Sequence, residues 1–112
     1  MTVITDEYIQ QMLARTKEYS LVILKAGLSR QMAGADRIVR EHGRRNFALR
    51  EEGILSIVCP VRDGGAVNGI GTFNAGTDRI RQIMDEDPGV RAGIFAYEVH
   101  TCRSFPKDCL PL

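Results

Sequence analysis

The stretch ILSIVCPVRDGGAVNGIGTFNA, residues 54–75, decides the fold because it reads as two strands joined by a tight turn. Its two parts, 54–61 and 67–75, are runs of strand-forming residues bounded by glycine and polar residues. The DGG sequence between them favours the kind of turn that closes a hairpin. We therefore expect a pair of antiparallel strands in the middle of the chain.

Helices are expected on both sides of this hairpin. The range 35–51 has apolar residues at helical spacing and stops before Gly53, a typical helix-ending glycine. The range 77–87 has the same spacing and stops at Pro88, because the residue before a proline is pushed out of the α region. A further amphipathic helix is expected near the N-terminus, over 5–18.

Two more runs of strand-forming residues, 19–25 and 92–102, lie outside these two helices. From residue 19 onward the order is β-α-β-β-α-β. This order predicts an α+β fold of the ferredoxin-like type, with one four-stranded antiparallel sheet and two helices on one face. We divide the chain into an N-terminal helical extension (1–18), this domain (19–105) and a C-terminal tail (106–112).

The second face of the expected sheet needs a cover that the chain itself does not provide. The strands at 19–25 and 54–61 are apolar on both sides, and such strands are normally covered on both faces. The two helices cover one face only. A second copy of the chain is the simplest cover for the other, so we expect a homodimer and leave open a larger oligomer.

Charge and composition exclude several classes of function. Fifteen Lys and Arg residues balance 14 Asp and Glu residues to a net charge of +1, whereas a nucleic-acid-binding domain normally has a clear basic excess. No apolar run is long enough to span a bilayer, and the N-terminus lacks the pattern of a signal peptide. The three cysteines form no CxxC motif. We expect a cytoplasmic protein that binds neither nucleic acid nor membranes and needs no metal or other cofactor.

The arginine-rich segment 40–50 sorts into two faces when it is placed on a helix of about 100° per residue. His42 falls inside the apolar face, between Ile38 and Leu49. The opposite face carries the charged residues Arg37, Arg40, Glu41 and Arg44. The arginine cluster is therefore interpreted as a solvated helix face, and His42 as an inward-pointing residue.

Two interpretations of His42 remain open at this point. An inward histidine is often a core residue hydrogen-bonded to a backbone carbonyl. It is also suited to acid–base catalysis, because an imidazole titrates near neutral pH. A carboxylate partner would favour the second interpretation.

Asp87 is the candidate for that partner. The two helices should lie side by side on the sheet, so the turn after the second can approach His42 on the first. Its expected position at the C-terminus of the helix 77–87, beside Asp85 and Glu86, would tend to raise its pKa. A nearby imidazolium would oppose that tendency and keep Asp87 ionised.

Other residues are candidates for binding a ligand. Arg45 and Asn46 follow His42 at a spacing of about one helical turn and are expected to orient a polar or anionic group. Phe73 and Tyr97, on nearby strands, are candidates for the pocket wall, although core packing explains them as well.

Two further patterns permit alternative interpretations. Gly69 and Gly71 share one strand face, which suggests room for a packed helix or a ligand. Glu98, His100 and Cys102 alternate onto one face of the last strand with a spacing that suits a soft metal, but no fourth ligand is in view.

The segments HGRRNFALREEGILSIVCP (42–60) and DPGVRAGIFAYEV (87–99) together resemble the YciI-like (YCII-related) domain. The resemblance covers about residues 19 to 105 and implies a dimeric α/β barrel, in which two sheets pair and leave a cavity. It also implies an active site built from a histidine and an aspartate, at His42 and Asp87. Family members commonly carry an arginine three residues before the histidine, where this chain has Val39, and Arg45 is a possible substitute.

Our first hypothesis is a small homodimeric enzyme in which His42 and Asp87 perform acid–base chemistry on a small organic molecule. Isomerisation, elimination and hydrolysis are the reactions considered. The alternative is a non-catalytic ligand-binding or regulatory module, in which backbone contacts hold His42 neutral and Asp87 points to water. An oxygen-dependent monooxygenase is a third option, by analogy of fold alone.

Overall fold

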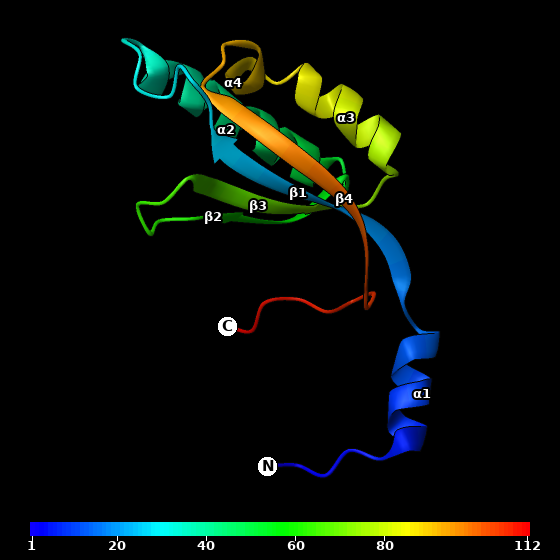
Figure 1. Cartoon of the computed structure of the whole chain (residues 1–112). Coiled ribbons are helices and arrows are strands. Elements are labelled where there is room, and N and C mark those ends of the chain that lie inside the picture. Colours follow the sequence, from blue (N-terminus) through cyan, green and yellow to red (C-terminus); the bar gives the residue numbers. More distant parts are fainter.

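The computed structural model describes all 112 residues and contains four helices and four strands (Figure 1). The helices are α1 (Asp6–Ala14), α2 (Ala35–Glu51), α3 (Thr77–Asp85) and α4 (Pro88–Arg91), and the strands are β1 (Lys17–Ala26), β2 (Leu55–Pro60), β3 (Val67–Phe73) and β4 (Phe95–Ser104). The strands form one antiparallel sheet in the order β2-β3-β1-β4. This topology confirms the expected ferredoxin-like α+β fold.

Several boundaries differ from the expected ones by a few residues, such as the start of β4 at Phe95 instead of 92, and two differences have a clear physical cause. α1 ends at Ala14, earlier than expected, because β1 already begins at Lys17 and pairs with β4 along its whole length, from Lys17–Ser104 to Ala26–Phe95. After α3, Pro88 does not only end a helix: it opens the short helix α4, which the sequence analysis did not foresee.

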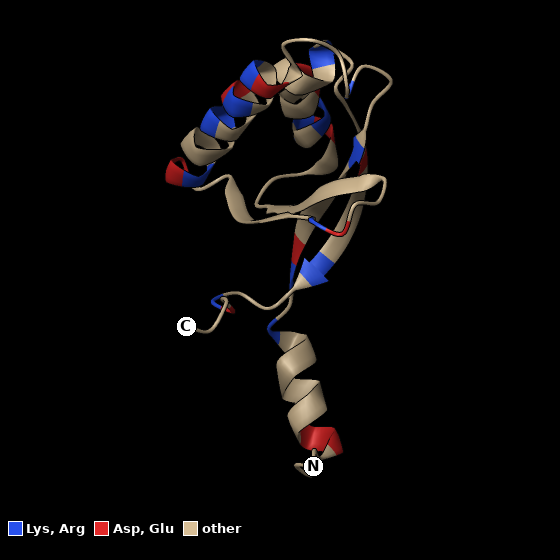
Figure 2. Cartoon of the chain, turned by 90° about the vertical axis from the view of Figure 1, so that its left-hand side faces the viewer, with Lys and Arg blue, Asp and Glu red and all other residues tan.

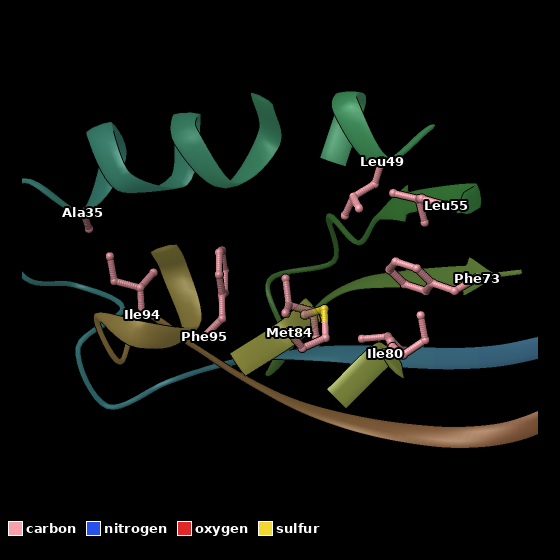
Figure 3. Close-up of a cluster of buried hydrophobic side chains, with 10 residues drawn as sticks. Ala35, Leu49, Leu55, Phe73, Ile80, Met84, Ile94 and Phe95 are labelled. Atoms are coloured by element: carbon pink, nitrogen blue, oxygen red, sulfur yellow. The ribbon is translucent and has the colours of Figure 1, made fainter. Parts of the chain in front are cut away.

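Helices α2, α3 and α4 lie on one face of the sheet and enclose the core (Figure 1). Figure 3 shows how the core is assembled, with Leu49 of α2 beside Leu55 of β2, Phe73 extending from β3, and Ile80 and Met84 extending from α3. As the periodicity predicted, α2 turns one face to this core. Its buried residues are Ala35, His42 and Leu49.

The other face of the sheet has no helix against it. Alternation along β1 places Leu21 and Ile23 on this open face, opposite to the buried Val22 and Leu24. β2 and β3 contain no charged residue, and Figure 2 shows charge only near the tip of their hairpin. The open face is thus apolar where β1, β2 and β3 adjoin, as the sequence indicated, whereas Glu98 and His100 of β4 and Lys25, which pairs with Glu98, make its other side polar.

Helix α1 projects away from the rest of the molecule (Figure 1). None of its residues is buried, and Tyr8, Ile9 and Leu13 are 48%, 45% and 42% exposed. The projection gives a radius of gyration of 16.4 Å, compared with about 13 Å for a compact domain of about 100 residues. No helix is both long enough and apolar enough to cross a bilayer.

Candidate active site

His42 and Asp87 form a buried, hydrogen-bonded pair. His42 Nδ1 lies 2.8 Å from Asp87 Oδ1, and the two residues are 8% and 1% exposed. His42 reaches this position from the inward face of α2, and Asp87 from the turn between α3 and α4. The backbone-held neutral histidine and water-facing aspartate of the non-catalytic alternative are not what the structure contains.

Asp87 is fixed by the start of α4. It is the N-cap of this helix: its Oδ2 accepts hydrogen bonds from the backbone N–H groups of Gly89 at 2.9 Å and Val90 at 3.2 Å. Pro88 occupies the first helical position, where its missing N–H is not needed. One carboxylate oxygen is thereby used by the backbone, and the other is aimed at His42.

The expectation for the pKa of Asp87 was right about His42, which lowers it, and wrong about the backbone, which lowers it as well. Burial raises the pKa of Asp87, but the hydrogen bond and charge of His42 and the backbone donors at Val90 and Gly89 together lower it below the ordinary 3.8. The sequence analysis placed Asp87 at the negative end of α3. The structure places it at the N-terminus of α4, where N–H groups stabilise the carboxylate.

The remaining contacts of His42 define which nitrogen is free to exchange a proton. Because ionised Asp87 can only accept, Nδ1 of a neutral His42 carries the hydrogen in this pair. Nε2 then bears the lone pair, and Asn46 Nδ2 lies 3.3 Å from it in position to donate. Phe95 packs against the imidazole with ring centroids 4.8 Å apart.

A cavity of about 460 Å³ adjoins this pair, between α2 and the helix-covered face of the sheet. His42 and Asn46 lie in its wall. Its floor is mostly apolar and includes Val22, Leu24, Gly69, Gly71 and Phe73. The two glycines of β3 thus lie in the floor of a cavity, which agrees with the room for a ligand that their positions on one strand face suggested.

Two of the residues expected to bind a ligand lie elsewhere. The Arg45 guanidinium donates from Nη1 to the carbonyl of Ile83 at 2.7 Å and lies 3.7 Å from Asp87 Oδ1, so it supports the turn that carries Asp87. Tyr97 donates its hydroxyl to Asp85 at 2.6 Å. Burial, together with the hydrogen bond and charge of Asp85, raises the pKa of Tyr97 to about 12. Neither residue lines the cavity.

Three residues of the cavity wall were missed by the sequence analysis: Arg30, Asn68 and Phe95. Asn68 sits where the pairing of β3 with β1 shifts register, and its Oδ1 is the one buried side-chain oxygen or nitrogen without a hydrogen-bond partner. Such an unpaired group costs about 1–3 kcal/mol. The sequence signal that could have identified Asn68 is a polar residue within a run of strand-forming residues.

The alternative metal site at the end of β4 is not assembled in the structure. No group of three or more His, Cys, Asp or Glu residues is arranged to hold a metal ion. Glu98 instead pairs with Lys25 of β1, its Oε2 lying 2.9 Å from Nζ.

Comparison with known proteins finds a likeness among solved structures. No family model and no curated protein matches the chain. Among solved structures, it is similar to the 5-chloro-2-hydroxyhydroquinone dehydrochlorinase TftG from Burkholderia phenoliruptrix AC1100, in complex with 2,5-dihydroxybenzoquinone. The two are 16% identical, with a TM-score of 0.49 over 72% of this chain and 90% of that chain. The assignment of the site therefore rests on its own geometry.

Proposed function

We propose that the protein is a small enzyme in which His42 and Asp87 catalyse proton transfer on an organic molecule held in the cavity. The observation that carries the proposal is the buried pair itself: Nδ1 bonded to Asp87 at 2.8 Å, on a histidine that lines a 460 Å³ cavity. A pair of this kind, with a base oriented by a buried carboxylate, is the arrangement that general acid–base catalysis needs.

In the proposed mechanism His42 is the catalytic base and Asp87 its positioning residue. Nε2 removes a proton from the bound molecule, and the resulting imidazolium is stabilised by Asp87 across the Nδ1 hydrogen bond. Nε2 then returns the proton to another atom of the substrate or to a leaving group. Isomerisation and elimination both follow this course. In hydrolysis the proton would come from an attacking water.

The contacts around the pair suit a His42 that gains and loses a proton, rather than a permanent ion pair with Asp87. Asp87 already accepts two backbone hydrogen bonds, so its charge remains stabilised when His42 is neutral. Asn46 Nδ2 lies within hydrogen-bond distance of the second ring nitrogen, Nε2, and Phe95 packs against the ring. Asp87 and Phe95 therefore hold the ring in both of its protonation states, whereas the Asn46 donor bonds only to the neutral ring.

We also propose that the enzyme is a homodimer of the YciI-like type. The apolar open face of the sheet supports this, because Leu21 and Ile23 are only half-buried there. The ferredoxin-like sheet and the buried histidine–aspartate pair are the two features that agree with the resemblance seen in the sequence.

The test is a proton-exchange assay that does not require the natural substrate. Wild-type protein is incubated in D₂O with a panel of small cyclic ketones, enones and hydroxyquinones, and deuterium incorporation at carbon is followed by NMR. We expect incorporation into at least one compound and a loss of about 100-fold or more in His42→Gln. His100→Gln is the matched control, since His100 is exposed on β4 and the chain has two histidines.

A second measurement on the same samples checks the pair. The ¹⁵N shifts of neutral His42 should report hydrogen on Nδ1 in the wild type, with a weaker preference in Asp87→Asn. If panel compounds shift the resonances of cavity residues and wild-type protein still incorporates no deuterium, the protein is a binding module and the proposal is wrong.

A further inference from the structure

Arg30 has no acidic partner, although it is half-buried in the wall of the cavity. It makes no ion pair, and its side chain donates no hydrogen bond to the protein. Its one specific contact is with Phe95, whose ring centroid lies 5.7 Å from the guanidinium carbon. A half-buried cation without a counter-charge is unusual, because buried charges are normally paired.

The contact with Phe95 leaves the binding groups of Arg30 available. The contact places the positive guanidinium over the Phe95 ring, and none of its five N–H donors is hydrogen-bonded to a protein acceptor. Those donors match a carboxylate, which can accept two parallel hydrogen bonds from one arginine. The same Phe95 ring packs on His42, so Arg30 and the catalytic imidazole contact one aromatic side chain.

The charge of the cavity is of one sign. Its lining includes Arg30 and Arg62 but no aspartate or glutamate. Arg62 is exposed at the β2–β3 hairpin, and most of the other lining residues are hydrophobic. A cavity of this kind accepts an apolar body carrying a negative group and repels a cationic one.

Backbone contacts hold Arg30 in place. Its loop follows β1 and is joined to the turn before β4 by hydrogen bonds from Gly27 N–H to the Ile94 carbonyl at 2.7 Å and from Ser29 N–H to the Gly93 carbonyl at 2.9 Å. A Cβ atom at Gly27 would collide with the carbonyl oxygen of Gly93, so only glycine permits this approach.

We infer that the substrate is a ring-sized carboxylate, whose anionic group binds Arg30 while its apolar body rests on the glycine floor of β3. This inference rests on the proposed function, since it names the substrate class for the same cavity. It moves the anion-binding role from Arg45, where the sequence suggested it, to a loop residue beside Phe95.

The experiment is a binding titration that needs no turnover. Benzoate and benzamide, a neutral compound of the same shape, are titrated separately into the full-length protein and followed by ¹H–¹⁵N NMR. We expect saturable shifts at Gly69, Gly71 and Phe95, with benzoate at least about 10-fold tighter, because charged partners form stronger hydrogen bonds than neutral ones. Arg30→Gln should remove the preference for benzoate.

Control variants separate Arg30 from general charge effects. Arg37→Gln, on the solvated face of α2, should keep the preference, and Arg30→Lys should keep part of it. Arg62→Gln should have a small effect that disappears with added salt, because its charge is exposed. The backbone NMR spectrum of each variant verifies that it is folded.

Three results would overturn the inference: no saturable binding of benzoate, equal binding of benzoate and benzamide, or an unchanged preference in Arg30→Gln. The outcome is independent of catalysis, because the titration measures binding without turnover. A protein that prefers benzoate through Arg30 but incorporates no deuterium would therefore contradict the proposed enzyme and leave the anion site standing.

Discussion

Asp87 serves two structural purposes with its two carboxylate oxygens, which makes its substitutions informative. Asparagine has one oxygen and an NH2 group, so it keeps either the cap or the acceptor for His42 and loses the charge, whereas alanine loses both acceptors and the charge. At neutral pH we expect the free energy of unfolding to fall by about 1–3 kcal/mol in Asp87→Asn and by about 3–5 kcal/mol in Asp87→Ala. Urea unfolding measures both values.

The effect of Asp87→Asn should depend on pH in a defined direction. The pKa of Asp87 is lowered in the folded protein, so its charge contributes stability that is fully present above the unfolded value of 3.8. That contribution is lost as the pH falls through the folded pKa. The difference in free energy of unfolding between wild type and Asp87→Asn should therefore become smaller below about pH 4.

The matched control for this effect is Asp78→Asn. Asp78 is fully exposed on α3 and pairs with Arg81 at 3.2 Å, and surface pairs of this kind contribute little. Its substitution should change the free energy of unfolding by less than about 0.5 kcal/mol. If the loss of unfolding free energy in Asp87→Asn stayed constant from pH 7 to pH 3, the charge of Asp87 would not stabilise the fold.

How far the site could be predicted depended on whether local rules or distant contacts place each residue. Helical periodicity was enough to turn His42 inward. The Asp87-Pro88 pair contained the N-cap signal of α4, but it was interpreted as the end of a helix, so the backbone was expected to raise the pKa of Asp87 and instead lowers it. Arg30 depends on the contact of its loop with Gly93, far away in the sequence, and no local pattern encodes it.

At the scale of elements, β3 forms the floor of the cavity, and its two glycines differ in what a side chain would meet. A Cβ at Gly71 would lie 3.0 Å from Phe73 Cε1 and 3.3 Å from Leu55 Cδ1, which is overpacked. At Gly69 the nearest atoms are the Cys59 carbonyl at 3.5 Å and Leu24 Cβ at 3.9 Å, which are ordinary contacts. A methyl group does not fit at Gly71, whereas Gly69 has space for one on the cavity side.

Gly69→Ala and Gly71→Ala should therefore separate binding from stability. We expect Gly71→Ala to lower the free energy of unfolding by about 1–3 kcal/mol, as overpacking does. Gly69→Ala should change it by no more than about 0.5 kcal/mol. The added methyl should still weaken benzoate binding severalfold by occupying the floor. Urea unfolding and the NMR titration measure the two effects, and unchanged binding in a folded Gly69→Ala would place the ligand elsewhere.

For the whole molecule, the open sheet face and α1 are the surfaces that the single chain leaves without a partner. On that face Ile23 lies beside Ile70 and Leu21 beside Thr72 on the β3 side, whereas their neighbours on the β4 side are Glu98 and His100. Helix α1 cannot cover the cavity of its own chain, because it projects from the far end of β1 (Figure 1). Both observations favour assembly, since isolated domains seldom expose such large contiguous apolar patches.

The proposed homodimer can be tested by a substitution at Ile70. Ile70 lies inside the sheet on β3 and is 40% exposed in the single chain, so a charge there is compatible with the fold but not with a second sheet packed against it. Light scattering should give twice the chain mass for wild type and the chain mass for Ile70→Glu. Ala48→Glu, on the exposed side of α2, should stay dimeric. A monomeric wild type, or an Ile70→Glu variant that remains dimeric, would show that this face is not the interface.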